Sequence, residues 1–100
     1  SVVWTETSRR QRRMILKYWT KRNGSSKYAE KLIKLVANQT KIILNHPESF
    51  KLSEYPETRE SALGHFSIYY KITNENLIIT AFWDNRQDPK SLLNALLSNK

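Results

Sequence analysis

The sequence of 100 residues contains no cysteine, only two glycines and one methionine, and no long apolar run. Without cysteine the chain can form neither a disulfide framework nor a thiolate metal site, and a reducing cytosol is the natural compartment. Two glycines are too few for a glycine-rich phosphate loop. No stretch approaches the roughly 20 apolar residues of a bilayer-spanning helix, and no secretory signal opens the chain. We therefore expect a soluble protein.

Metal ligands are also scarce. The two histidines, His46 and His65, lie far apart in the sequence, and capping or loop roles suit them better than metal binding. No nucleophile, base and acid stand in a recognisable catalytic arrangement. We predict neither a metal site nor a cofactor.

Acidic residues are also few. The sequence has nine Asp and Glu and 17 Lys and Arg, which gives a formal net charge of +8. On a chain this small the surface potential is mostly positive, so the expected partner is polyanionic. Nucleic acid, a ribosome, an acidic protein segment and an anionic membrane all fit. Four lysines share one face of an expected helix, and a solvated face is their simplest interpretation: Lys27, Lys31, Lys34 and Lys41.

The length suffices for one domain over residues 1–100 with a single two-layer core. The chain opens without a methionine directly into Val2-Val3-Trp4, so we expect it to be trimmed inside its first strand. Thr5 or Thr7 can cap a first helix, and Asn23-Gly24 ends it because glycine tolerates the left-handed conformation. The residues expected to face the core recur at helical spacing: Gln11, Met14, Ile15, Tyr18 and Trp19.

A second helix follows at once, capped by Ser25 or Ser26, and makes a helical hairpin with the first. His46-Pro47 ends it because the residue before proline is pushed out of the helical region. Its apolar positions again recur at helical spacing: Tyr28, Ala29, Leu32, Ile33, Val36, Thr40 and Ile43.

The remainder of the chain changes to a period of two. Residues 48–62 are polar and predict a short strand near Phe50 to Tyr55 followed by a loop. A hairpin then runs from Phe66 to Thr73 and from Leu77 to Trp83. The second of these strands is apolar on both faces, with Leu77, Ile79, Ala81 and Trp83 expected on one and Ile78, Thr80 and Phe82 on the other, so we expect it inside the sheet.

Asp88 and Pro89 predict a final short helix with a leucine stripe at Leu92, Leu93, Leu96 and Leu97. The predicted fold class is therefore α+β, with a helical hairpin packed on a small, mostly antiparallel sheet in the order β-α-α-β-β-β-α.

Four basic or titratable residues lie in or beside the expected sheet and are candidates for a common concave surface: Arg59, His65, Lys71 and Arg86. Arg86 follows a strand and precedes Pro89, a suitable place for an anion contact. The alternative is a salt bridge to Asp84 or Asp88 that holds the turn. Tyr69 is the aromatic candidate, because it lies opposite the Phe66-Ile68-Tyr70 face and aromatic rings can stack on bases. The alternative is a core position, which is the more common place for aromatic residues at strand spacing.

The order of several short motifs resembles toxins of bacterial type II toxin-antitoxin pairs, of the RelE/ParE superfamily. The resemblance covers nearly the whole chain and depends on the following segments: Val2-Val3-Trp4-Thr5, Tyr18-Trp19, Ala29-Glu30, Leu32-Ile33, Asn45-His46-Pro47, Gly64 to Ile72, and Phe82 to Pro89. It implies a small basic cytoplasmic protein that arrests bacterial growth when free and that a cognate antitoxin neutralises. No membrane partner is implied.

The superfamily contains two mechanisms, and the fold does not choose between them. RelE-like members cut mRNA in the ribosomal A site, whereas ParE-like members poison DNA gyrase. The departures of this chain from the nuclease pattern are informative. Ser67 and the segment Ser61-Ala62-Leu63 stand where the nucleases tend to place arginines, and Leu92 stands where some have a tyrosine. Of the usual nuclease set only Arg86 is kept.

These departures favour a ParE-like toxin that inhibits gyrase by binding it, with Arg59, Lys71 and Arg86 as contact residues. The first alternative is a ribosome-dependent mRNA endonuclease with Arg86 on the scissile phosphate and His65 or Tyr69 in proton transfer. Whether the chain is an enzyme therefore stays open. A non-toxic nucleic-acid-binding module is a third hypothesis, which explains the charge but not the closing motif.

Overall fold

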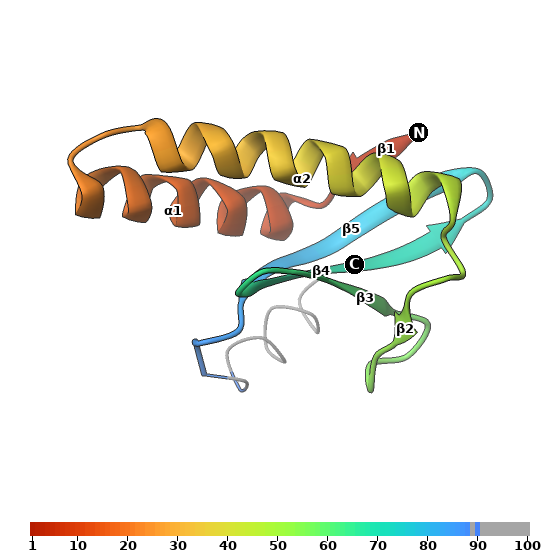
Figure 1. Cartoon of the computed structure of the whole chain (residues 1–100). Helices are drawn as coiled ribbons and strands as arrows, with labels where there is room; N and C mark the ends of the chain where they lie inside the picture. Colours follow the sequence, from red (N-terminus) through yellow and green to blue (C-terminus); the bar gives the residue numbers. More distant parts are fainter. Residues whose placement is uncertain (89, 91–100) are drawn as a thin grey trace.

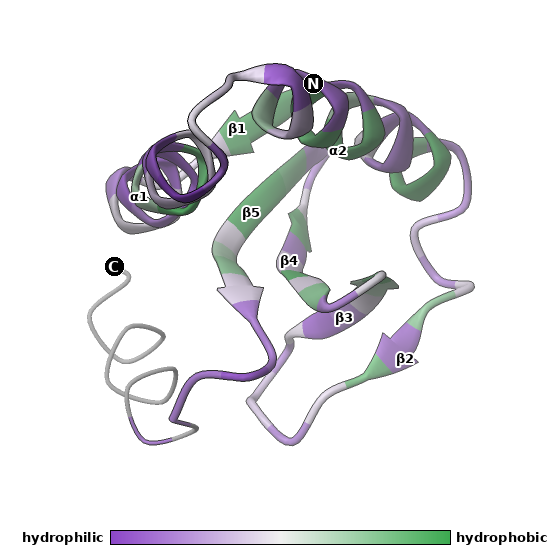
Figure 2. Ribbon diagram, turned by 60° about the vertical axis from the view of Figure 1, so that its left-hand side comes forward, coloured by the Kyte–Doolittle hydropathy of each residue, from purple (hydrophilic) through white to green (hydrophobic). Residues whose placement is uncertain are grey.

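Two helices cover one face of a five-stranded sheet in the computed structural model, which describes residues 1–88 and 90 (Figures 1 and 2). The elements are β1 (Val2–Trp4), α1 (Glu6–Asn23), α2 (Lys27–Asn45), β2 (Lys51–Leu52), β3 (Arg59–Leu63), β4 (Phe66–Thr73) and β5 (Asn76–Asp84). The sheet order is β1-β5-β4-β3-β2, with β1 parallel to β5 and the other pairs antiparallel. The α+β class and the helical hairpin are confirmed, while the predicted final helix lies outside the described residues.

Helix α1 begins at Thr5, whose side-chain oxygen accepts a hydrogen bond from the backbone nitrogen of Ser8 at 3.1 Å. The buried Ser8 hydroxyl in turn donates to the carbonyl oxygen of Ile79 in β5 at 2.9 Å, so the cap also ties the helix to the sheet. The helix ends at Gly24, which has φ 63°. This is the left-handed conformation that glycine adopts without a steric penalty.

Helix α2 begins at Ser26, whose side chain makes no capping hydrogen bond, and ends at His46 as predicted. Its inner face buries the residues that pack on the sheet: Ala29, Leu32, Val36, Thr40 and Ile43. Ile33, which the periodicity placed with them, is half exposed. The main core joins this helix face to the β4 and β5 side chains Phe66, Ile68, Tyr70, Leu77, Ile79 and Phe82.

The prediction for the two faces of β5 is wrong after Ile79. The register pairs Tyr70 with Ile79 but Tyr69 with Ala81, so Thr80 forms a bulge. One extra residue moves every following side chain to the opposite face. Phe82 therefore joins Leu77 and Ile79 under the helices, while Ala81 and Trp83 face the other way beside Tyr69.

Strand β3 occupies part of the segment that was expected to be a loop. It pairs with β4 from Arg59↔Tyr70 to Leu63↔Phe66, across a turn at Gly64 with φ 62°. Little in its own sequence, Arg59 to Leu63, is typical of a strand. Pairing with the long β4 supplies the hydrogen bonds, a tertiary effect on strand formation. The prediction that β5 lies inside the sheet is confirmed, since it runs between β1 and β4.

Candidate functional site

The turn after β5 is attached to the neighbouring hairpin. The backbone nitrogen of Asn85 donates to the carbonyl oxygen of His65 at 2.9 Å, and the Asn85 side chain exchanges hydrogen bonds with the Ser67 hydroxyl. The backbone nitrogen of Gln87 donates to the carbonyl oxygen of Asp84 at 3.0 Å. Residues 84–87 therefore have a defined conformation at the edge of the core, and Arg86 is presented from it.

Arg86 is held by Asp84 in a bidentate ion pair. Its Nε and terminal nitrogen donate to the two carboxylate oxygens at 2.9 and 2.7 Å, and its backbone nitrogen adds a third bond at 3.0 Å. Arg86 is the main cause of the lowered pKa of Asp84, and His65 lowers it further. The pair in turn raises the pKa of Arg86. The salt-bridge interpretation of Arg86 is thus confirmed, with Asp84 as the partner.

The guanidinium of Arg86 also lies 5.2 Å from the centre of the Trp19 ring on α1, so the arginine side chain connects the turn to the helix. A second guanidinium, that of Arg22, lies 5.9 Å from the same ring. About half of the Arg86 side chain remains exposed. Two cations over one indole create a spot that is both aromatic and positive at the rim of a groove.

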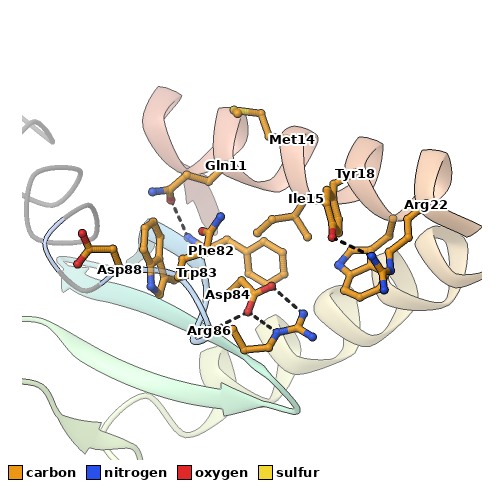
Figure 3. Close-up of a pocket in the computed structure, with 12 residues that line it drawn as sticks. Gln11, Met14, Ile15, Tyr18, Arg22, Phe82, Trp83, Asp84, Arg86 and Asp88 are labelled. Carbon is orange, nitrogen blue, oxygen red and sulfur yellow. Dashed lines mark hydrogen bonds and ion pairs between the residues drawn. The ribbon is translucent and has the colours of Figure 1, made fainter.

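This groove runs between α1 and the end of β5 and has a volume of about 860 Å³ (Figure 3). Its lining is mainly apolar and aromatic: Gln11, Met14, Ile15, Tyr18, Trp19, Arg22, Phe82, Trp83, Asp84, Arg86, Gln87 and Asp88. The Gln11 side-chain oxygen accepts a hydrogen bond from the backbone nitrogen of Phe82 at 3.0 Å and joins the two walls. The arrangement suits the binding of an apolar segment with a polar or anionic end.

Two groove residues correct the prediction for the first helix. Met14 and Tyr18 were expected to face the core, but they are 63% and 55% exposed. A helix contacts a core through a limited stripe, and these two residues lie on one edge of the predicted stripe. Ile15 and Trp19, toward the other edge of the stripe, do pack against the main core. The predicted apolar stripe was wider than the surface that a helix usually buries, and this width was the sequence signal that some of its residues line an exposed groove.

Tyr69 lies on the face of the sheet that is turned away from the helices. It is buried beside Ala81 and Trp83, with its ring 6.0 Å from that of Tyr55. Burial raises the pKa of Tyr69, and the Glu60 carboxylate, with which it shares a side-chain hydrogen bond, raises it further. The core alternative for Tyr69 is therefore confirmed and the exposed stacking role is not, because the Tyr55 loop and Trp83 surround the ring.

The remaining candidates do not converge on one surface. The Arg59 guanidinium donates to the carbonyl oxygen of Phe50 at 2.6 Å, on the helix-facing side of the sheet. Lys71 pairs with Ile78 on the opposite side, near the far end of β4. His65 lies exposed in the turn before β4, where it shares the end of the sheet with Asp84 and Arg86. The structure thus places His65 and Arg86 at the same end of the sheet and leaves Arg59, Lys71 and Tyr69 elsewhere.

The described part of the chain holds no group of three or more His, Asp or Glu side chains placed to bind a metal ion. Within the same residues, no helix has the length and apolar character to span a membrane.

Comparison with known protein families shows which family this chain belongs to. The family model of the ParE toxin of the parDE type II toxin-antitoxin system matches residues 2–89. The chain belongs to the ParE toxin family. The chromosomal ParDE toxin-antitoxin system from P. aeruginosa is a similar solved structure, with a TM-score of 0.71 and 20% identity over 82% of this chain and 91% of that one. No curated protein sequence matches.

The match to the ParE toxin family spans every described element from β1 to the turn that carries Arg86. The resemblance seen in the sequence is therefore confirmed. The similarity to the P. aeruginosa structure, at this level of identity, supports the fold alone.

Proposed function

We propose that this chain is a ParE toxin that arrests bacterial growth by binding DNA gyrase in the cytoplasm. We further propose that a cognate antitoxin neutralises it by covering the same or an overlapping surface. The observation that carries this proposal is the groove between α1 and β5, with its apolar lining and its rim of Arg22, Asp84 and Arg86. Such a groove provides a contact surface without requiring any chemical step.

The position of Arg86 supports binding over RNA cleavage. A nuclease arginine must place its cation on the phosphate as negative charge develops. Here the guanidinium fork is engaged by the Asp84 carboxylate through two hydrogen bonds. A phosphate would have to compete with that carboxylate for the same donors.

The groups expected to move protons also fit RNA cleavage poorly. General acid-base catalysis requires groups within hydrogen-bond reach of the same reacting atoms. Tyr69 is buried on the sheet face opposite Phe66 and Phe82, and its raised pKa makes it a still weaker proton donor than an exposed tyrosine. His65 shares the end of the sheet with Arg86 but lies exposed in a turn. Of the three candidate catalytic residues, Arg86 and His65 therefore lie at one end of the sheet, while Tyr69 lies on the face turned away from the helices.

Two assays on the purified protein separate the hypotheses. In a gyrase supercoiling assay we expect inhibition, and in primer extension on ribosome-bound mRNA we expect intact message. Cleaved message with unaffected supercoiling would establish the endonuclease instead. Loss of those cleavage ends in Arg86→Ala would then assign the cut to this chain.

A matched pair of variants tests the groove itself. Met14→Glu places a carboxylate in the groove, whereas Leu52→Glu changes an equally exposed apolar residue on β2, with 63% and 62% exposure respectively. Both alter the net charge by the same amount. We expect gyrase inhibition to fall at least tenfold for Met14→Glu, the equivalent of about 1.4 kcal/mol of binding free energy, and to be unchanged for Leu52→Glu. Equal inhibition by both variants would contradict the groove as the contact surface.

The antitoxin is tested by genetics. We expect an adjacent short open reading frame with an acidic product, and coexpression of that product should restore growth. Growth that stays arrested on coexpression would contradict this part of the proposal, while leaving the gyrase assay unaffected.

A further inference from the structure

The positive charge of this protein is concentrated in the helical hairpin. Residues 6–45 contain 11 of the 17 Lys and Arg but only two of the nine Asp and Glu, a net charge of +9. The rest of the chain carries a net charge of −1. The excess of positive charge therefore belongs to one layer of the fold, and the sheet layer is close to neutral.

Within that layer the charges form two rows, which together we call the basic ridge. All of its side chains are exposed: Arg9, Arg10, Arg13, Lys17 and Lys21 on α1, and Lys27, Lys31, Lys34 and Lys41 on α2. The α2 lysines lie opposite the buried face of Leu32, Val36 and Ile43. In Figure 2 the outward sides of both helices are correspondingly coloured hydrophilic.

The row along α1 is regular. Arg9, Arg13, Lys17 and Lys21 follow one another at intervals of four residues, so that neighbours lie one turn apart on the helix surface. At 1.5 Å per residue the row extends for about 18 Å. The ridge thus presents closely spaced cations along a straight, convex edge.

These cations are largely uncompensated. Among residues 1–88 and 90, the ion pair on the hairpin is that of Arg10 with Glu6, at 3.4 Å. Like charges four residues apart destabilise a helix, and a surface that serves solubility alone usually mixes both signs. A partner of opposite charge lying against an unmixed row would offset this repulsion.

We propose that the basic ridge binds the phosphate backbone of duplex DNA, independently of base sequence. Protein interfaces depend on aromatic and apolar residues at their centre, and the exposed arc of α1 between Arg9 and Lys21 is dominated by cations. A phosphate backbone requires only cations at regular intervals. DNA is favoured over duplex RNA because the wide major groove of B-form DNA admits a convex helix, whereas the A-form groove is deep and narrow.

This inference does not rest on gyrase as the target, because the binding is measured with DNA alone. The groove between α1 and β5 is lined by Met14 and Tyr18, whereas the ridge lies on the outward arc of α1. Target binding and DNA binding can therefore fail separately.

The test is fluorescence anisotropy with labelled DNA duplexes of about 20 base pairs, several times the reach of the ridge. Two unrelated sequences should bind equally well, and the logarithm of the binding constant should fall linearly with the logarithm of the salt concentration. A duplex RNA of the same length should bind more weakly.

The variants are Arg13→Gln with Lys17→Gln on the ridge, and Lys51→Gln with Lys90→Gln away from the hairpin as the control. Both pairs remove the same charge, and glutamine keeps the helix propensity of the ridge residues. We expect the salt slope to decrease in magnitude by about 2 for the ridge pair, roughly one unit per lost phosphate contact, and to stay unchanged for the control pair. Circular dichroism checks that both fold.

Three outcomes overturn the proposal. The first is the absence of salt-dependent DNA binding, and the second is an equal decrease in slope for the control pair, which would make net charge the sole cause. The third is tighter binding of a poly-glutamate peptide than of the duplex at the same salt concentration. That result would assign the ridge to an acidic protein segment.

Discussion

The carboxylate of Asp84 accepts three hydrogen bonds from a single residue, Arg86, two from the guanidinium and one from the backbone nitrogen. The pair closes the turn after β5 and leaves the guanidinium beside the Trp19 ring. Arg86 therefore connects the end of the sheet to α1 at the rim of the groove. Its role depends on this partner more than on its position in the sequence.

We expect Arg86→Ala to lower the free energy of unfolding only slightly, since solvent-exposed ion pairs contribute little. Urea denaturation of Arg86→Ala, Asp84→Ala and the double variant gives the coupling between the two side chains. A coupling near zero would show that the bidentate geometry contributes nothing in solution. Arg86→Lys is the control, because it keeps the charge but loses the fork.

The same pair predicts a dependence on pH. Arg86 holds the pKa of Asp84 below its ordinary value of 3.8 in the folded chain. The contribution of the pair to stability is therefore complete above the unfolded pKa and is lost as the pH falls through the lower folded pKa. Unfolding measured between neutral pH and about pH 2 should show that the difference between the original chain and Asp84→Asn shrinks below about pH 4. A constant difference would contradict the lowered pKa.

The raised pKa of Tyr69 predicts that stability also depends on pH in the alkaline range. Because burial and Glu60 raise its pKa above 10.0, the folded chain keeps the phenol protonated where an unfolded tyrosine ionises. Its contribution to stability is present below about pH 10 and is lost as the pH rises further. Ultraviolet titration should show a late-ionising phenol that Tyr69→Phe removes. A phenol that titrates near pH 10 in the original chain and disappears in the variant would contradict this prediction.

The variant Tyr69→Phe also bears on function. It keeps the ring beside Tyr55 and Trp83 but removes the hydroxyl. If the chain acts by binding, growth inhibition should stay within about twofold of the original, equivalent to less than about 0.5 kcal/mol. If a folded Tyr69→Phe variant no longer inhibited growth, the result would support a catalytic role for the Tyr69 hydroxyl instead.

The two helix starts give a matched test of capping. The Thr5 side chain accepts a hydrogen bond from the Ser8 backbone, whereas Ser26 makes no capping bond through its side chain. We expect Thr5→Ala to cost about 1 kcal/mol and Ser26→Ala only a few tenths. Thermal or urea unfolding of both variants measures the difference. Equal costs would mean that the Thr5 bond does not stabilise the folded chain.

Local signals in the sequence predicted the helices well, because each depends on residues close in the chain. Thr5, Gly24 and His46-Pro47 mark the ends where the structure has them. Strand β3 was missed because pairing with β4, and not the composition of residues 59–63, makes it a strand. Within the candidate site, Arg86 was predicted as either an anion contact or a salt bridge, and nothing local could decide between these two.

The sequence by itself determined the positive charge of the hairpin, the limits of both helices and the resemblance to the RelE/ParE superfamily, since these depend on composition and on the order of short segments. Only the tertiary structure decided which side chains share a surface. The bulge at Thr80 turned Phe82 toward the helices and Trp83 away from them. Packing of α1 on β5 left Met14 and Tyr18 on the edge of a groove. Each of these outcomes depends on the register or contact between elements far apart in the chain, which periodicity along one element does not contain.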